Sequence, residues 1–326
     1  MSHHFILRAT KRGVLTTASA ALAVALAFVL AAAAWFASTA PAHAQQAPPP
    51  PAASPAQTPP ACDRACLKKT LDTYMAAVFK HDPGAAGLSA DTYATENTAE
   101  VKSGERFWKA FSGYGAVNRG FFDPLNGSAA FLGVLKQTAG EDRITSVRIK
   151  VEGGKVSEAE WIVAGEGADQ GKPTPQGLID YPPPDTPLPP AERSTRFMVK
   201  SLVSDFYQAV DDHTGEWIPS DPNCYRVENG GPPTWKWGCL GHFEAFDQRV
   251  REVSLRRYPL IDEEMGVVLC SVIFQHYPGK AGHDTLVHEY IQIRKDQVHA
   301  WWTSMYFLPP DSPTTNGWEN RHWQWR

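Results

Sequence analysis

Tyr93-Ala94-Thr95-Glu96-Asn97 and Tyr225-Arg226-Val227-Glu228-Asn229 are the two stretches that decide the fold of this 326-residue chain. They share the pattern Tyr-x-x-Glu-Asn and lie 132 residues apart. The apolar residues at helical spacing that precede each stretch repeat at the same offset: Leu67, Leu71, Tyr74, Ala77 and Val78 correspond to Val199, Val203, Phe206, Ala209 and Val210. The offset also carries His81 onto His213, just past each expected helix end. The chain therefore contains two copies of one unit.

The strands that follow repeat as well. Residues 149–156 read as a hairpin, because Gly153-Gly154 supplies the positive φ angles of a two-residue turn. Residues 291–298 are its counterpart at an offset of 142, so the second copy has gained ten residues in between. Asn126-Gly127 predicts an earlier turn in the first copy. The corresponding strands of the second copy are expected near residues 249–258 and 266–277.

This order of helix, Tyr-x-x-Glu-Asn segment and strand meander resembles the nuclear-transport-factor-2-like superfamily, which includes the SnoaL-like proteins. The Tyr-x-x-Glu-Asn segment and the strand Lys155-Val-Ser-Glu-Ala-Glu160 are similar to a secreted branch of undefined activity. The resemblance implies an α+β class with two tandem cone-shaped domains, each a curved antiparallel sheet wrapped around N-terminal helices. The superfamily hosts isomerases, dehydratases, epoxide hydrolases and non-catalytic binding modules, so the fold alone does not set the function.

The N-terminus reads as an export signal. Basic residues at Arg8, Lys11 and Arg12 precede an apolar stretch over 14–36, and Ala42-His43-Ala44 matches a cleavage site. A retained membrane anchor is the alternative, since the apolar stretch is long. Small residues and Pro41 stand where stop-transfer charges belong, which favours cleavage and a secreted or periplasmic location.

The remaining boundaries follow from composition, above all from the 27 prolines. The expected segments are a signal peptide (1–44), a disordered Pro/Ala tether (45–61), the first domain (62–165), a Pro-rich linker (166–192), the second domain (193–312) and a Trp-rich tail (313–326).

Charge excludes some partners. The chain carries 31 basic and 35 acidic residues. Cleavage of the signal segment would remove three of the basic residues and leave 28 basic against 35 acidic residues. This acidic balance argues against nucleic acid and against an acidic membrane surface. No phosphate-binding loop, dinucleotide fingerprint or serine-nucleophile elbow occurs, so no cofactor is expected.

Export makes disulfides possible for the five cysteines. Cys224 and Cys239 flank a Gly/Pro-rich loop and are expected to pair. Cys62 and Cys66 are close enough to bridge at a helix start. Cys270 lies in an apolar run and reads as a buried free thiol.

Glu158 and Glu160 are the strongest candidates for acid–base chemistry. If Gly153-Gly154 is the turn, Ile149 pairs with Glu158 and Val147 pairs with Glu160, so both carboxylates share one face of the sheet. The other members of that face are apolar: Val147, Ile149, Val151, Val156 and Ile162. Carboxylates about 7 Å apart on an apolar wall raise each other's pKa, as a general acid or base requires.

Two alternatives remain for this pair. The carboxylates face solvent near Lys150 or Arg148, or one of them pairs with a buried arginine. The second copy has Ala300 and Trp302 at these positions, so only the first domain would act in this way.

Other polar and aromatic residues are candidates for holding a ligand at the mouth of each cone. They are Tyr93, Glu96, Asn97 and Trp108 in the first copy and Tyr225, Glu228 and Asn229 in the second. The alternative is that the Glu-Asn pairs hold the fold by satisfying backbone groups. His81 and His213 read as helix caps before they read as bases.

Tryptophans gather after residue 200. Trp301 and Trp302 read as core residues, whereas Trp235 and Trp237 could stack on a ligand.

A metal site is not expected, because the spacing of the histidines and acids near the C-terminus matches no helix motif. These residues are His283, His288, Glu289 and His299.

Two functions fit the sequence. One is an exported, metal-free acid–base enzyme of lyase, isomerase or hydrolase type acting on a small, partly apolar molecule. The other is a non-catalytic ligand-binding or scaffolding protein, in which Trp108, Phe121 or Phe131 plugs the cone. In either case, tandem duplication predicts a monomer built as an intramolecular pseudo-dimer.

Overall fold

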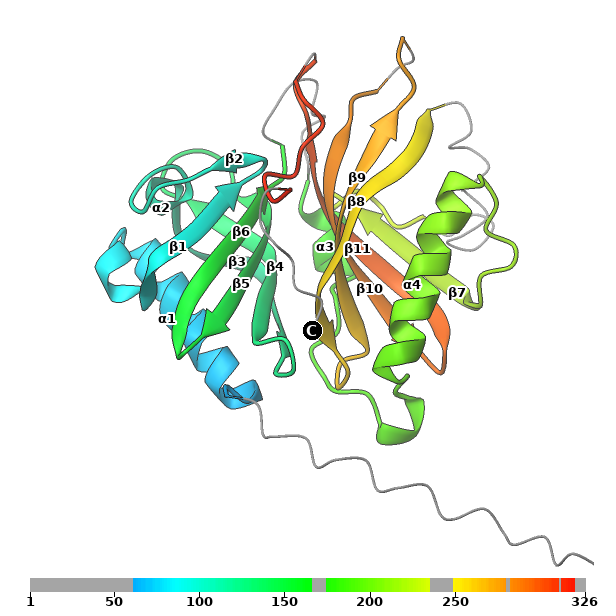
Figure 1. Ribbon diagram of the computed structural model, residues 1–326, viewed down its shortest axis with the longest axis horizontal. Helices are drawn as coiled ribbons and strands as arrows, with labels where there is room; N and C mark the ends of the chain where they lie inside the picture. The colour runs from blue at the N-terminus through cyan, green and yellow to red at the C-terminus, as the bar shows by residue number, and fades with distance from the viewer. Residues whose placement is uncertain (1–60, 166–173, 235–248, 280–281, 311, 320–326) are drawn as a thin grey trace, which may run out of the picture. The chain divides into compact units, whose positions relative to one another are not determined.

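The computed structural model contains two mixed β-sheets and describes residues 61–165, 174–234, 249–279, 282–310 and 312–319 (Figure 1). The signal segment, nearly all of the tether, Trp235, Trp237 and Cys239 lie outside these ranges. Within the described ranges, no helix combines the length and the apolar character that crossing a bilayer requires.

The first half is built from three helical segments and six strands. They are α1 (Arg64–Phe79), the 3-10 helix η1 (Pro83–Ala85), β1 (Leu88–Glu96), β2 (Ala99–Glu100), α2 (Phe107–Ala110), β3 (Phe111–Asp123), β4 (Ser128–Gln137), β5 (Arg143–Glu152) and β6 (Lys155–Val163). The second half follows α3 (Gln176–Asp180) and the 3-10 helix η2 (Pro190–Glu192), and its described elements repeat the order of one long helix and five strands. Its elements are α4 (Arg196–Asp211), β7 (Ser220–Glu228), β8 (Val250–Asp262), β9 (Val267–His276), β10 (Thr285–Arg294) and β11 (Gln297–Phe307).

Apart from the edge strand β2, which has no counterpart among the described strands of the second half, the two sheets have the same topology. The strand orders are β2-β1-β6-β5-β4-β3 and β7-β11-β10-β9-β8. The first strand of each half runs parallel to the last, and the other pairs are antiparallel as expected, so each sheet is mixed. The α+β class with one sheet for each copy is confirmed, and α4 and β7 begin 132 residues after α1 and β1.

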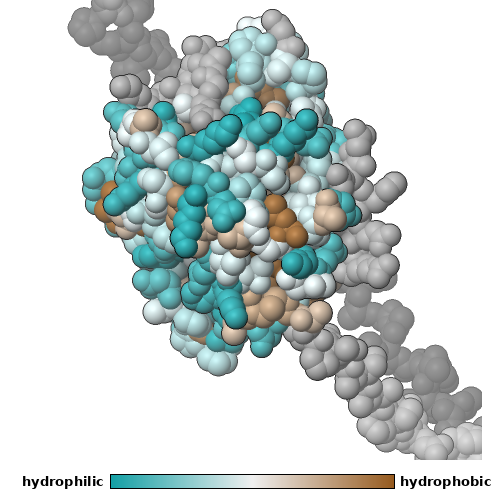
Figure 2. Space-filling model, turned by 90° about the vertical axis from the view of Figure 1, so that its left-hand side faces the viewer, coloured by the Kyte–Doolittle hydropathy of each residue, from teal (hydrophilic) through white to brown (hydrophobic). Residues whose placement is uncertain are grey.

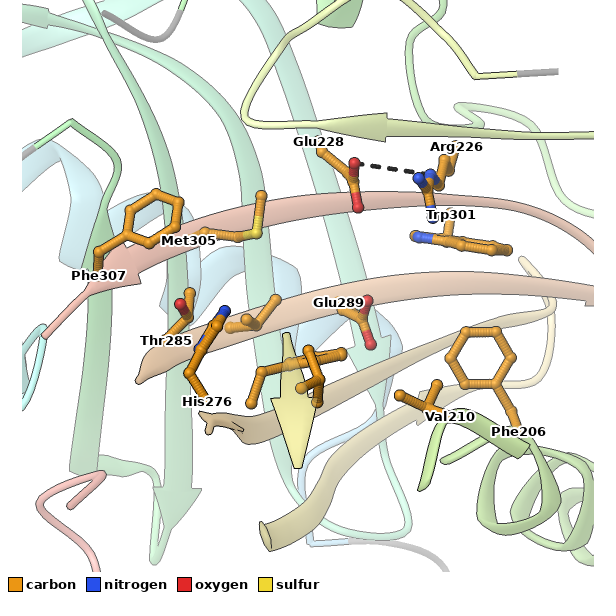
Figure 3. Close-up of a pocket in the computed structure, with 13 residues that line it drawn as sticks. Phe206, Val210, Arg226, Glu228, His276, Thr285, Glu289, Trp301, Met305 and Phe307 are labelled. Atoms are coloured by element: carbon orange, nitrogen blue, oxygen red, sulfur yellow. Dashed lines mark ion pairs between the residues drawn. The ribbon is translucent and has the colours of Figure 1, made fainter. Parts of the chain in front are cut away.

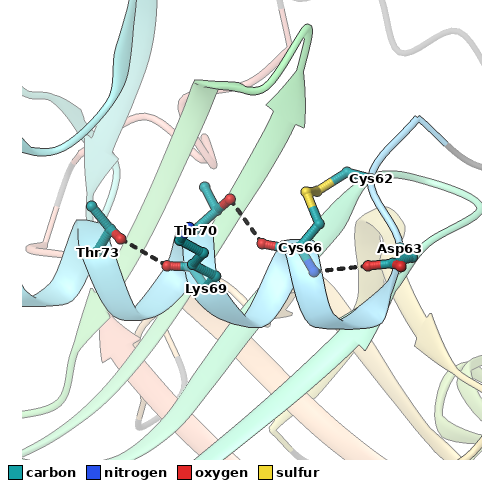
Figure 4. The surroundings of a disulfide bond; sticks show 6 residues. All are labelled: Cys62, Asp63, Cys66, Lys69, Thr70 and Thr73. Atoms are coloured by element: carbon teal, nitrogen blue, oxygen red, sulfur yellow. Dashed lines mark hydrogen bonds between the residues drawn. A yellow bond between two sulfur atoms is a disulfide. The ribbon is translucent and has the colours of Figure 1, made fainter.

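Helix α1 begins at a well-formed cap (Figure 4). The Asp63 carboxylate accepts a hydrogen bond from the backbone N–H of Cys66 at 2.8 Å, which satisfies a donor that the first turn leaves open. The predicted Cys62–Cys66 disulfide is present beside this cap. Cys224 is disulfide-bonded, but its predicted partner Cys239 lies outside the described residues. Cys270 is a buried free thiol, as expected.

Each half has its own hydrophobic core between its helix and its sheet. The first core is dominated by aromatic side chains: Tyr74, Phe107, Trp108, Phe111, Phe131 and Trp161. Phe107 stacks on Trp161 with ring centroids 4.3 Å apart, and the indole N–H of Trp161 donates to the Tyr74 hydroxyl at 3.0 Å. Trp108 and Phe131 thus lie inside the first half, whereas Phe121 belongs to a third core between the two sheets.

The faces predicted for β6 were wrong. The Gly153-Gly154 turn is present, with φ angles of 55° and 75°, and Val151 does pair with Val156. A bulge follows, so Glu158 pairs with Lys150 and Glu160 pairs with Arg148. One extra residue moves every later side chain to the opposite face. Both carboxylates therefore point away from the first core and toward the side of the second sheet.

The two sheets pack against each other along an interface that we call the seam. At the ends of β3 and β8, each half forms the same set of contacts with the other half across the seam. Asp262 accepts from the Phe122 backbone N–H at 2.8 Å, and Asp123 accepts from the Ile261 backbone N–H at 2.9 Å. Each aspartate also pairs with an arginine at the start of the other half's first helix. The distances are 2.7 Å for Arg64–Asp262 and 2.6 Å for Arg196–Asp123. Because Arg64 and Arg196 correspond at offset 132, and Asp123 and Asp262 at offset 139, the contact has the self-complementary form of a two-fold interface.

Candidate functional site

A cavity of about 150 Å³ lies inside the second half, between α4 and the concave side of its sheet (Figure 3). Its described lining consists of Phe206, Val210, Arg226, Glu228, Val250, Phe274, His276, Thr285, Val287, Glu289, Trp301, Met305 and Phe307. Most of these side chains are apolar or aromatic, and a few polar groups converge among them. That composition is typical of a small-molecule site.

Glu289 is the unusual group in this cavity. It comes from the middle of β10, where its neighbours on the same face are Val287 and Ile291, and it is 4% exposed. The Tyr207 hydroxyl, from α4, donates to Glu289 Oε2 at 2.5 Å. Burial raises the pKa of Glu289 to about 7, and the nearby Glu228 charge adds to the rise, while Tyr207 and Arg226 oppose it. A carboxyl group with this pKa exchanges its proton near neutral pH.

Arg226 and Glu228, both from β7, form one wall of the cavity. Arg226 Nε lies 3.6 Å from Glu228 Oε2, and its guanidinium lies over the Trp301 ring at 5.9 Å from the centroid. Arg226 is buried, while the Glu228 side chain is 38% exposed. The pair therefore places a neutralised ionic group at the edge of an otherwise apolar space.

The cavity has a closed end and an open end. Phe206, Trp301 and Glu289 are buried at the closed end, whereas Phe274, His276, Met305 and Phe307 are partly exposed near the ends of β9 and β11. Desolvation lowers the pKa of His276, so this ring is neutral at physiological pH. A ligand would enter past neutral and apolar groups before it reaches Glu289.

Glu160 does not line this cavity. It is fully buried in the seam, where Arg257 from β8 pairs with its Oε1, and Ser271 donates to the same oxygen at 3.2 Å. Nε2 of the neutral, buried His288 lies 3.3 Å from the same oxygen. The nearby Arg257 and His288 outweigh the opposing effect of burial and hold the Glu160 pKa far below its ordinary value. Glu160 is thus the buried partner of an arginine, which was the second alternative for this pair.

Glu158 lies beside Glu160 on the seam face. It forms an ion pair with Arg148 from the neighbouring strand. The Arg148 guanidinium also lies over the ring of Trp318, and Arg257 lies over the same ring, at 5.9 and 5.5 Å. These contacts neutralise the charges, and the Glu158 side chain stays 27% exposed, so the two carboxylates are not the free pair on an apolar wall that the predicted strand register required.

The side chains of the first Tyr-x-x-Glu-Asn segment form hydrogen bonds within the protein and have a structural role. The Tyr93 hydroxyl donates to the Gly317 carbonyl at 2.5 Å, which ties the tail to β1. Glu96 accepts from Arg106 at 2.6 Å. Asn97 has a φ of 60°, and its side-chain oxygen accepts from the Val163 backbone N–H at 3.0 Å.

In the second Tyr-x-x-Glu-Asn segment, Tyr225 and Asn229 also have structural roles, whereas Glu228 lines the cavity. Asn229 has a φ of 45° and accepts from the Met305 backbone N–H at 2.7 Å. Tyr225 packs against Trp302 in the core between the sheets, at 5.9 Å between ring centroids. Of the seven residues proposed to hold a ligand, only Glu228 lines the cavity; Trp108 is buried in the first core.

Glu289 is the residue that the sequence reasoning missed. It was considered only as a metal ligand, together with His288 and His299. Within the described ranges, no group of three or more His, Cys, Asp or Glu is placed to hold a metal ion. The signal was a lone acid alternating with Val287, Ile291 and Ile293 along a strand, which is the same argument that was applied to Glu158.

A second cleft, of about 410 Å³, lies where α1 and β3 meet Pro184 and Pro187. Its charged groups are already paired: Lys68 with Asp72 at 2.7 Å and Arg119 with Asp185 at 3.5 Å. It therefore offers weaker chemistry than the cavity around Glu289.

Comparisons with known proteins add the following. A family model described as a domain of unknown function (DUF8021) matches residues 192–304. No curated protein matches the chain in sequence. The chain is 14% identical to an NTF2-like protein of unknown function from Cytophaga hutchinsonii, over 30% of this chain and 88% of that one, with a TM-score of 0.25.

Two further solved structures are similar over comparable lengths. A protein of unknown function with a cystatin-like fold from Methylobium petroleophilum is 13% identical over 34% of this chain and 84% of that one, with a TM-score of 0.29. A designed protein with a curved β-sheet is 17% identical over 32% and 89%, with a TM-score of 0.27. The residues that the family model matches include Glu289 and all of the described cavity lining except Met305 and Phe307.

Proposed function

We propose that the second half of this chain is a small-molecule site in which Glu289 exchanges a proton with the bound molecule. The protein would be an acid–base enzyme of lyase, isomerase or hydrolase type, acting on a small and partly apolar substrate. The observation that carries this proposal is a buried carboxyl group with a pKa of about 7 at the closed end of an apolar cavity.

The geometry gives the carboxyl group a defined orientation. Because the Tyr207 hydroxyl donates to Oε2, the proton of the neutral acid is carried by Oε1. The carboxyl group points into the cavity (Figure 3), so a bound molecule would meet a donor when Glu289 is neutral and an acceptor when it is ionised. Tyr207 acts as a positioning residue in this arrangement.

Only the second half carries this chemistry. In the first half, the residue at offset 142 from Glu289 is Val147, and the interior is occupied by Trp108, Phe131 and Trp161. The first half therefore serves as a scaffold that covers one face of the second sheet. This assignment reverses the sequence-based expectation that only the first domain would act.

We also propose that the protein is exported. The basic and apolar N-terminal residues support this, and so do the Cys62–Cys66 disulfide and the disulfide-bonded state of Cys224. An export assay on the full-length chain, with Arg8, Lys11 and Arg12 changed together as the control, would test it.

The proton-exchange proposal is tested by nuclear magnetic resonance on protein labelled with ¹³C at glutamate side-chain carboxyls. Glu289→Gln identifies the Glu289 signal by its loss. We expect a titration midpoint near pH 7 in the unchanged protein. Tyr207→Phe removes a hydrogen bond that lowers the pKa, so the midpoint should move to higher pH. A midpoint at the ordinary value for glutamate would overturn the proposal.

A non-catalytic ligand-binding protein is the second candidate. It is favoured by the fact that Glu289 is, among the described lining residues, the one buried carboxyl group, since the Glu228 side chain is 38% exposed. A single proton-exchanging group suffices to orient a ligand. The enzyme predicts that Glu289→Gln loses turnover but keeps binding of an apolar ligand, whereas the binding protein shows no turnover in either form.

A further inference from the structure

We infer that the cavity selects an uncharged molecule with one ring and a single hydrogen-bonding group, which it holds against Glu289. This inference rests on the proposed function and names the class of ligand for the same site. Three features of the described lining carry it: its volume, its walls and its balance of charge.

Volume limits the ligand to one ring. The cavity measures about 150 Å³, and an engineered cavity of that volume in another protein binds benzene. A second fused ring would extend past the buried residues toward Met305 and Phe307 at the partly exposed end. A longer substituent on a single ring could point out through this opening, but a larger ring system would not reach Glu289.

The walls favour a ring over a flexible chain. Phe206 and Trp301 meet at 5.2 Å in a T-shaped contact at the closed end, and Val210 and Val287 complete that surface. Aromatic faces and edges contact a flat ring with favourable geometry. A rigid ring also loses less conformational entropy on binding than an open chain of the same size.

Charge balance excludes ions of either sign. Arg226 is neutralised by Glu228 at 3.6 Å, and the remaining acid, Glu289, is held by Tyr207. While Glu289 carries its proton, an anion finds Arg226 already paired with Glu228, and a cation finds Glu228 already paired with Arg226. Either ion would then give up its hydration without gaining a free partner of opposite charge. A neutral hydroxyl or carbonyl group avoids this cost.

The test uses isothermal titration calorimetry on the full mature chain with four probes. Benzyl alcohol is the neutral one-ring probe, benzoate and benzylamine carry the two charges, and 1-naphthalenemethanol adds a second ring. Titrations at pH 6 and pH 8 sample both forms of Glu289. The groups around it that could also respond are Tyr207, Arg226, Glu228, Cys270 and His276.

At pH 6 we expect benzyl alcohol to bind at least about tenfold more tightly than the other three probes, because the charged probes lose their hydration and the two-ring probe is too large for the cavity. Val287→Phe fills the cavity and should abolish binding. Met305→Ala widens the open end and should improve binding of the two-ring probe while leaving the preference for neutral ligands intact.

Binding of a charged or two-ring probe at pH 6 as tight as that of benzyl alcohol would overturn this inference. So would the absence of binding by all four probes to a folded protein. The proposed function is judged separately, by the titration midpoint of Glu289. A midpoint near pH 7 with tight binding of benzylamine would remove the ligand class and leave the acid–base site standing.

Discussion

Glu160 and Glu289 are two buried carboxyl groups with opposite electrostatic surroundings. Glu160 accepts hydrogen bonds from Ser271 and Arg257 and is held ionised, whereas Glu289 has a phenol for a partner and apolar neighbours and is neutral over much of the pH range. The contrast follows from which charges reach each group, since both are fully desolvated. The same residue type therefore serves as a structural anion in the seam and as a proton-exchanging acid in the cavity.

Glu289 should make the protein less stable as the pH rises. Its pKa is raised from 4.5 to about 7, so the folded state binds the proton more tightly than the unfolded state. Stability contributed by this group is present below pH 4.5 and falls as the pH rises to 7, by about 3 kcal/mol in total. We expect Glu289→Gln to remove this decline, as measured by urea unfolding between pH 4 and 8. An equal decline in both proteins would contradict the assignment.

Glu160 should act in the opposite direction. Its pKa is lowered by Arg257 and His288, so its contribution is present at neutral pH and is lost as the pH falls below the ordinary glutamate value. Removing one member of a buried ion pair costs about 3 to 5 kcal/mol. We therefore expect Glu160→Gln to destabilise strongly, and Glu160→Met combined with Arg257→Met to recover most of the loss. A double variant as unstable as the single one would show that the pair is not the cause.

At the level of elements, Asn97 and Asn229 perform the same task in both halves. Each adopts a positive φ directly after the first strand and accepts a backbone N–H from the last strand, at Val163 and Met305. The asparagine side chain thereby ends the parallel strand pair in each sheet. This local chemistry explains why asparagine stands at the end of the motif in both copies.

Asn97→Ala should destabilise the chain more than Asn97→Gly. Both changes remove the bond to Val163, which is worth about 1 kcal/mol. Alanine adds a penalty of about 1 to 2 kcal/mol for the left-handed backbone, which glycine avoids. The order of thermal midpoints should be wild type, then glycine, then alanine, and Asn229 should give the same order. Equal effects of glycine and alanine would show that the backbone conformation is not the reason for asparagine.

Local sequence signals predicted most elements but not the strand register. The helical spacing in α1 and α4 and the Gly153-Gly154 turn were correct, because they depend on neighbours in the chain. The bulge between that turn and Glu158 has no comparable signal: it depends on pairing across strands. Lys295-Asp296 repeats the turn in β10–β11, and a bulge follows there too, so the feature belongs to the fold and not to one sequence.

At the scale of the whole molecule, the two sheets pack through equivalent strands. β3 contacts β8 and β6 contacts β11 across the seam, and Arg64–Asp262 mirrors Arg196–Asp123. The face that each sheet turns away from its own helix is thereby covered within the chain. The side of the surface seen in Figure 2 is largely hydrophilic, with small separate apolar spots, which is the usual character of a solvent-facing surface.

We predict that the mature protein is a monomer. Covering both sheet faces inside one chain removes the apolar surface that would otherwise drive pairing of subunits. Light scattering coupled to size exclusion should give the mass of one chain across the concentration range. Asp123→Ala, which breaks the seam by removing the partner of Arg196, should broaden this peak or shift it. A mass of two chains for the unchanged protein would contradict the prediction.

The sequence did not reveal which half holds the cavity. That outcome depends on how large side chains fill space, which no periodicity encodes. Trp161 and the α2 aromatics fill the first interior, whereas Thr303 stands at the position equivalent to Trp161 in the second. The repeat shows that Glu289 takes the position that Val147 has in the first half. It does not show that the Glu289 side chain is buried.

The reciprocal Arg–Asp pairs would form equally well between two copies of either half, but the Glu160–Arg257 pair would not. At offset 142 the second half carries Trp302 in place of Glu160, so two second halves joined in this way would leave Arg257 facing an indole instead of a carboxylate. Each half therefore pairs with a charge that only the other half supplies, and neither half could form the same seam with a second copy of itself.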